Sequence, residues 1–317
     1  MIEHVKLDID RNIAEPTSTG SLQRHELVST RGRRYDLNTY HVKADRMDDE
    51  NEDQRSTIVV LQPFSDFVER PFQQERLKAI SDWTGRNVIG IDNPGVGLTT
   101  SNLALGDAWR LGRGNWDDMT GLQWQALAEV LGDDKDSTPL TLSYFSLGAS
   151  TAAAMTANAP EWAAGTIDQV VLWDSAAPVD IAFGRLAARY ARYGGDGWET
   201  YIKENPAWMP EPSTAKFLIG RILKQPIGHA AYPVAMGATS VMEHLQRAND
   251  RDITPRFTII NGSESRVSPT PENDELANQL RRFAGANAVC RVIFGDETHA
   301  VHDSIPRSKA AIPYWRL

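Results

Sequence analysis

A strand that turns directly into a helix constrains the fold of this chain more than any other stretch. Residues 139–145 form a short apolar run typical of a buried strand, and the alanine-rich residues 149–155 favour a helix. Ser146 lies at the corner, where its hydroxyl projects away from the sheet and the N–H groups of the helix start point toward negative charge. Serine is also a common helix N-cap, so this stretch alone leaves a nucleophile and an ordinary cap both open.

Further apolar runs of strand length alternate with segments of helical periodicity. This alternation predicts an α/β chain with a mostly parallel sheet and helices on both faces. An Arg31-Gly32-Arg33 turn between two alternating segments predicts an antiparallel hairpin ahead of that sheet. The predicted strands are 57–61, 87–91, 140–145, 169–174, 256–262 and 289–294, and the predicted helices are 67–83, 116–131 and 271–284.

The pattern changes between residues 178 and 252, where glycines and prolines break helical segments and no strand pattern occurs. We therefore predict a helical cap at 178–252, inserted into a core of 1–177 and 253–317. The large apolar and aromatic side chains of this interval either line a partly apolar pocket or form the core of the cap. They are Phe183, Tyr190, Tyr193, Trp198, Tyr201, Trp208, Met209, Phe217 and Met236.

Composition narrows the class of protein. The 317 residues are 41% hydrophobic, no run is long enough to span a membrane, and the first residues carry no apolar signal-peptide stretch. The single cysteine, Cys290, excludes an intrachain disulfide, and a net charge of −9 argues against nucleic acid. No metal-ligand or dinucleotide pattern occurs, so we expect a cytoplasmic protein with a small-molecule substrate, no cofactor and no metal. The oligomeric state stays open.

The corner reads Tyr144-Phe145-Ser146-Leu147-Gly148, and residues 92–97 read Asp-Asn-Pro-Gly-Val-Gly. With the strand order, these motifs resemble the α/β-hydrolase family, whose nucleophile lies in a G-x-S-x-G corner. The resemblance implies an eight-stranded α/β-hydrolase sheet with an inserted cap, and it implies Ser146 as the nucleophile. Tyr144 replaces the first glycine of the pattern.

The resemblance also implies a histidine base in the loop after the last strand. Residues 295–303 follow that strand, and His299 is the candidate base, with His302 as the alternative. The family usually places the acid after the preceding strand, where this chain has Ser265. Asp174, at the end of the strand next to the serine strand, is the favoured acid, and Glu264 is the alternative.

For the oxyanion hole, the resemblance implies two backbone N–H donors, those of Leu147 and Phe64. Phe64 is the third residue of Gln62-Pro63-Phe64, where the family usually has H-G-x. The predicted function is hydrolysis of an ester, amide or related acyl bond through a Ser-His-acid triad and an acyl-enzyme. The alternative is a catalytically impaired relative that acts as a ligand-binding or interaction protein, which Tyr144, Pro63 and Ser265 favour.

Overall fold

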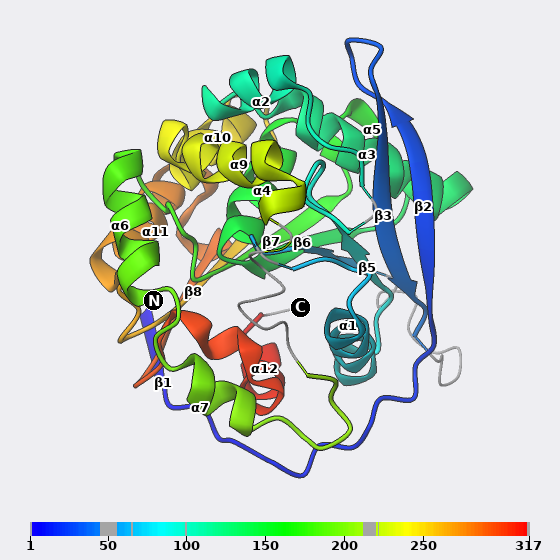
Figure 1. Cartoon of the computed structure of the whole chain (residues 1–317). Coiled ribbons are helices and arrows are strands. Elements are labelled where there is room, and N and C mark those ends of the chain that lie inside the picture. The colour runs from blue at the N-terminus through cyan, green and yellow to red at the C-terminus, as the bar shows by residue number, and fades with distance from the viewer. Residues whose placement is uncertain are drawn as a thin grey trace.

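One mixed sheet of nine strands runs through the molecule (Figure 1). The computed structural model describes residues 2–44, 56–64, 66–98, 100–211, 220 and 222–315; the side chain of Tyr144 and all of Phe217 lie outside this part. The strand order is β1-β9-β8-β7-β6-β4-β5-β3-β2. The bounds are β1 Ile2–Val5, β2 Gly20–Val28, β3 Arg34–Val42, β4 Thr57–Leu61, β5 Val88–Ile91, β6 Leu140–Phe145, β7 Ile167–Trp173, β8 Arg256–Gly262 and β9 Val289–Phe294.

The predicted strand count of eight is wrong by one. The additional strand is β1, which pairs in parallel with the edge of β9, from Ile2 opposite Arg291 to Val5 opposite Phe294. Residues 3–10 alternate apolar and polar side chains, but only Ile2–Val5 pair with a neighbour, so the pairing with β9 and not the local pattern sets the bounds of this strand.

The predicted hairpin is confirmed: β2 pairs antiparallel with β3, and Gly32 in the turn has the positive φ of 74° that glycine adopts readily. β3 continues the sheet by pairing antiparallel with β5.

The central strands are parallel and covered on both faces. Alternate residues of β4 enter two different apolar clusters, with Val59 and Leu61 on one face and Ile58 and Val60 on the other. This follows from the two-residue period of a strand, and it explains the uninterrupted apolar runs in the sequence. The parallel α/β sheet predicted from the sequence is therefore confirmed.

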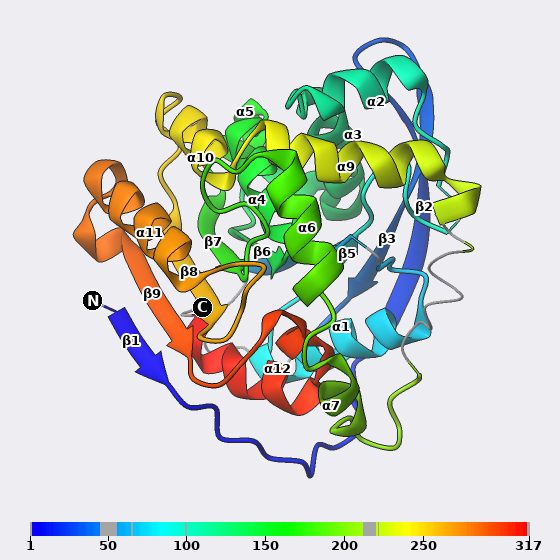
Figure 2. The same cartoon turned by 60° about the vertical axis from the view of Figure 1, so that its left-hand side comes forward.

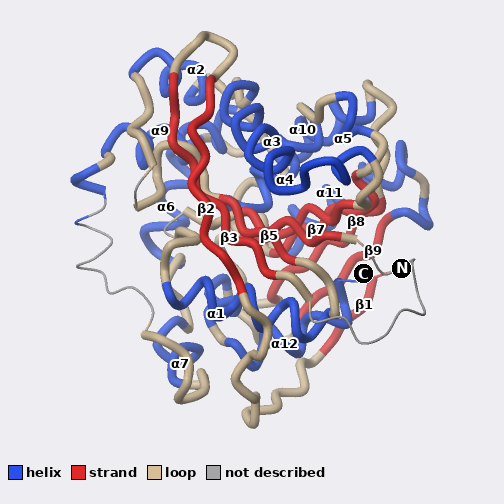
Figure 3. Tube along the Cα trace, turned by 90° about the vertical axis from the view of Figure 1, so that its right-hand side faces the viewer, coloured by secondary structure: helices blue, strands red, loops and turns tan. Residues whose placement is uncertain are grey.

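Helices cover the sheet on both sides. Figure 3 shows α1 and α12 on one side of the strands and α3, α4 and α5 on the other. The bounds of these helices and of α2 and α11 are α1 Pro71–Thr84, α2 Leu105–Gly112, α3 Asp117–Leu131, α4 Leu147–Ala157, α5 Glu161–Ala164, α11 Thr270–Ala284 and α12 Ile305–Ala311. Short 3-10 helices are η2 Gly132–Asp136, η3 Ala286–Ala288, η4 His299–Asp303 and η5 Ile312–Trp315.

The interval 178–252 is helical in its described part and contains no strand there. Its helices are α6 Phe183–Tyr193, α7 Trp198–Lys203, α9 Pro226–Ala238 and α10 Val241–Asn249. α6 lies beside α9 (Figure 2), whereas α10 packs against α4 of the central layer. The division into a core and a cap at these boundaries stays a prediction. Among the described residues, no helix combines the length and the apolar character needed to cross a bilayer.

Candidate active site

Ser146 occupies a strained corner between β6 and α4. Its φ of 57° and ψ of −120° lie where non-glycine residues are rare, and its N–H donates to the Trp173 carbonyl at 3.1 Å. Ser146 is only 3% exposed. α4 begins at Leu147, so the N–H groups of its first turn have no acceptor within the helix. The corner thus places a hydroxyl beside the N-terminus of α4, where Ala149 N–H donates to the Ser146 carbonyl at 3.2 Å.

Asp174 takes the equivalent position on the neighbouring strand. Phe145 of β6 and Trp173 of β7 are register partners, so Ser146 and Asp174 are the first residues after paired strand ends. Asp174 also has a positive φ, 51°, and it is completely buried. The parallel register alone therefore brings these two side chains to the same edge of the sheet.

His299 completes the group from the loop that follows β9. Its Nε2 lies 3.2 Å from Ser146 Oγ, and its Nδ1 lies 3.4 Å from Asp174 Oδ2. The ring rests against Phe145, with 4.6 Å between ring centroids. The second contact is at ion-pair distance but does not have hydrogen-bond geometry; catalytic hydrogen bonds are often long or poorly aligned in a free enzyme and tighten in its complexes. The structure thus brings the three predicted residues together.

Burial raises the pKa of Asp174, and its neighbours partly offset this. His299 and the hydroxyls of Ser265 and Ser268 lower the pKa because they stabilise the charged form. Ser265 Oγ accepts from the Ser268 N–H at 3.2 Å, and Ser268 Oγ accepts from Asn273 Nδ2 at 2.9 Å. Each hydroxyl therefore keeps its own proton to donate toward the carboxylate. Ser265, at the position where the family usually has the acid, thus lowers the pKa of the carboxylate that follows the neighbouring strand.

Glu264, the alternative acid, is exposed. Its N–H donates to the Glu297 carbonyl at 2.9 Å, and no hydrogen bond or ion pair joins its carboxylate to His299 in the described part of the chain.

His302, the alternative base, points into a different environment. Its ring stacks on Phe145 at 3.5 Å between centroids, and its Nε2 lies 3.4 Å from Asp303. Burial, with a smaller contribution from the Arg76 charge, lowers its pKa well below the ordinary value. His302 therefore packs against Phe145, the residue that precedes Ser146.

One group of side chains has metal-ligand types: the ligand atoms of Asp66, His302 and Asp303 lie within 4.8 Å of one another. Asp66 already binds Arg70 and Gln73, and the charges of Arg70 and Arg76 act on Asp303. Cationic side chains thus already act on both carboxylates, and this cluster is part of an internal ion network.

The loop after β4 carries the other predicted oxyanion donor. The Gln62 carbonyl accepts from Asn93 Nδ2 at 2.7 Å, and the Pro63 carbonyl accepts from the Asp66 N–H at 3.2 Å, so the loop is held on both sides of Phe64. The Phe64 ring packs edge-on against His229 of α9, with 5.7 Å between ring centroids. The backbone N–H groups of Phe64 and Leu147 remain candidates for the oxyanion hole.

A further side chain contacts the serine: the Tyr190 hydroxyl, from α6, forms a short hydrogen bond with Ser146 Oγ. The Tyr190 ring packs edge-on against His299 at 5.4 Å between centroids. The sequence placed Tyr190 only among residues that line a pocket or fill the cap. Nothing in its local pattern distinguishes it from Tyr193 on the same helix, so the packing of α6 decides which of the two reaches the serine.

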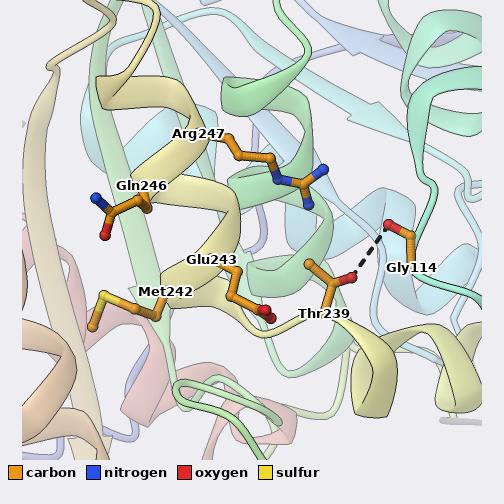
Figure 4. A pocket seen from close by; sticks show the side chains of 6 residues that line it. All are labelled: Gly114, Thr239, Met242, Glu243, Gln246 and Arg247. Carbon is orange, nitrogen blue, oxygen red and sulfur yellow. Dashed lines mark hydrogen bonds between the residues drawn. The ribbon is translucent and has the colours of Figure 1, made fainter.

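A surface pocket of about 380 Å³ lies elsewhere, between α10 and the segments around Gly114 and Thr239 (Figure 4). Thr239 Oγ1 donates to the Gly114 carbonyl at 3.2 Å on its wall. None of Ser146, Asp174 or His299 lines this pocket.

Comparison with solved structures finds similar folds in several enzymes. A bromoperoxidase from Bacillus anthracis aligns with a TM-score of 0.57 at 12% identity, covering 93% of this chain and 99% of that one. The Pyrococcus furiosus esterase Pf2001 aligns with a TM-score of 0.55 at 13% identity, covering 98% and 96%. An enol-lactonase from Burkholderia xenovorans LB400 aligns with a TM-score of 0.51 at 15% identity, covering 92% and 99%. No family model matches the sequence, and no curated protein matches it. At such identities the likeness shows the fold alone.

Proposed function

The chain has the α/β-hydrolase fold, and we propose that it is a serine hydrolase that cleaves an ester, amide or related acyl bond. One observation carries the proposal: Ser146 Oγ lies 3.2 Å from His299 Nε2, while the other ring nitrogen of His299 faces the buried Asp174. A hydroxyl needs a base within hydrogen-bond reach to become a nucleophile, and the base needs a carboxylate to fix its tautomer.

The proposed reaction has two halves. Ser146 Oγ attacks the carbonyl carbon and passes its proton to His299 Nε2, while Asp174 stabilises the imidazolium through Nδ1–H. The N–H groups of Leu147 and Phe64 are the proposed donors to the developing oxyanion. His299 then protonates the leaving group, which leaves an acyl-enzyme on Ser146. Water, activated by the same histidine, hydrolyses this ester and restores the serine.

The names of the structural neighbours support acyl chemistry, because two of them are an esterase and an enol-lactonase. We also propose that 178–252 is the cap over this site. Tyr190, which lies within that interval, contacts Ser146. Aromatic cap residues of this kind suit a small, partly apolar substrate.

The alternative is a relative that binds a ligand without turning it over. It is favoured by the Tyr190 hydroxyl on Ser146 Oγ and by the 3% exposure of Ser146, since a substrate must first gain access to the oxygen.

An activated fluorophosphonate distinguishes the two functions. We expect it to label the wild-type chain at Ser146, as read by mass spectrometry of the peptide, and to leave Ser146→Ala unlabelled. Hydrolysis of short p-nitrophenyl esters should be lost in the same variant. Equal labelling of both proteins, or no labelling of either, would reject the serine hydrolase.

A further inference from the structure

The two hydrogen bonds at Ser146 Oγ determine which hydroxyl is the donor in the bond between Tyr190 and Ser146. A serine hydroxyl has one proton, and in the reactive arrangement that proton is donated to His299 Nε2. The Tyr190 hydroxyl must therefore be the donor in its bond with Ser146 Oγ. A phenol proton is thus aimed at the oxygen that reacts.

Tyr190 keeps that proton under working conditions. Burial raises the pKa of its hydroxyl far above the ordinary value of 10.0, and only the bond with Ser146 lowers it. A phenol in this state is a hydrogen-bond donor that does not compete with His299 as a base.

Ion pairs and ring contacts fix the position of the hydroxyl. Arg189, the residue before Tyr190, donates two hydrogen bonds to Glu272 at the start of α11, at 2.8 and 2.5 Å. On the other side the Tyr190 ring packs against His299. A donor held in this way needs little reorganisation during the reaction, which is what makes such groups effective.

We propose that Tyr190 is a catalytic residue, which donates a hydrogen bond to the oxyanion of the tetrahedral intermediate. This inference rests on the proposed hydrolase function. When the bond from Ser146 Oγ to the carbonyl carbon forms, the C=O π pair moves onto the carbonyl oxygen and Oγ becomes a weaker, ether-like acceptor. The oxyanion is bonded to the same carbon as Oγ, so the Tyr190 hydroxyl reaches it through a small rotation. Tyr190 transfers no proton in this step: the Ser146 proton passes to His299 Nε2, which later donates it to the leaving group.

The test is Tyr190→Phe, which keeps the ring and removes the hydroxyl. Its matched control is Tyr193→Phe, on the same helix, whose ring lies under the Arg266 guanidinium at 5.1 Å and contributes no group to the site. Both variants and the wild type are titrated with the fluorophosphonate to count reactive serines. They are then assayed on aryl and alkyl esters of one acid with leaving groups of different basicity.

We expect Tyr190→Phe to retain one reactive serine per chain and to lose about 10²-fold in kcat, as other oxyanion donors do, by the same factor for every leaving group. Tyr193→Phe should behave as the wild type. An unchanged or higher kcat in Tyr190→Phe would overturn the proposal, because the tyrosine would then only cover the serine. A loss that grows with leaving-group basicity would also overturn it, in favour of leaving-group protonation. If the wild type itself is neither labelled nor active, the hydrolase function fails, and this inference fails with it.

Discussion

At the scale of single residues, the carboxylate position is the feature that departs most from the family pattern. Asp174 is buried and faces His299, while Ser265 occupies the place where the family usually has its acid. We expect Asp174→Asn to lose about 10⁴-fold in kcat on an ester substrate, because the amide does not hold His299 in the required tautomer. Glu264→Gln, the matched control at the exposed alternative, should lose less than twofold. A larger loss in Glu264→Gln than in Asp174→Asn would transfer the role to Glu264.

The serines around that carboxylate give a pH prediction. In Ser265→Ala the carboxylate of Asp174 loses a group that lowers its pKa, so the pKa rises further above the ordinary value of 3.8. Protonated Asp174 no longer stabilises the imidazolium, and we expect the acidic limb of the kcat/KM profile to move to higher pH. The measurement is the profile from pH 4 to 8 beside that of Ser263→Ala, an exposed serine in the same loop. Coincident profiles would mean that Ser265 does not act on Asp174.

Much of the candidate site can be predicted from the sequence, because its residues directly follow the ends of predicted strands. Ser146 and Asp174 each follow an apolar run, and parallel pairing places such residues at one edge. His299 follows the last strand in the same way. The contact of Tyr190 with Ser146 and the effect of Ser265 on the pKa of Asp174 cannot be predicted from the sequence, because they depend on how α6 and the loop after β8 pack in three dimensions. A four-residue strand such as β1 is missed for a related reason, since pairing rather than local pattern defines it.

At the scale of elements, the contact of Arg189 with Glu272 holds α6 over the site. Both side chains are partly buried, and the two charge-assisted bonds join an element of the interval 178–252 to α11. The elements near His299 are joined as well: Tyr201 of α7 donates to Glu297 at 3.1 Å and accepts from the Thr298 N–H at 3.0 Å.

We expect Arg189→Met to release α6 locally. Losing a hydrogen bond to a charged group costs about 1.5 kcal/mol, so amide exchange within residues 183–193 should become about tenfold faster, while β6 and β7 keep their protection. The matched control is Arg256→Met, which breaks the exposed pair of Arg256 with Asp168 and should leave α6 exchange unchanged. Exchange in α6 that is identical in all three proteins would show that this pair does not hold the helix.

At the scale of the whole molecule, Asp92 makes stability depend on pH. Asp92 is fully buried at the end of β5, accepts from the Val68 N–H at 2.8 Å, and lies near the Glu69 carboxylate. Its pKa lies well above the ordinary value of 3.8, first because of burial and then because of the Glu69 charge. The folded chain therefore binds this proton more tightly than the unfolded chain does. Its contribution to stability is present at low pH and is lost as pH rises from about 4 toward the folded pKa.

Asp92→Asn removes this titration. We expect the free energy of unfolding of the variant, relative to the wild type, to increase with pH by up to about 1.4 kcal/mol per pH unit within that window. Urea denaturation at several pH values between 4 and 7 measures it, with Asp133→Asn on the surface as the control. A constant difference between Asp92→Asn and the wild type across this range would contradict the assignment.

The pairing of β1 with β9 has a consequence for the order in which the protein forms on the ribosome. β1 is synthesised before the other eight strands, but its partner β9 is synthesised after all of them. The corner at Ser146 has its neighbouring strands earlier, because β6 pairs with β4 and β7, which are both synthesised before β8 and β9. In a nascent chain the strands on both sides of Ser146 are thus present before His299 has been translated. At that stage β1 still has no strand to pair with. The synthesis of β9 therefore has two effects: it gives β1 its partner at this edge of the sheet, and it is followed at once by the loop that carries His299.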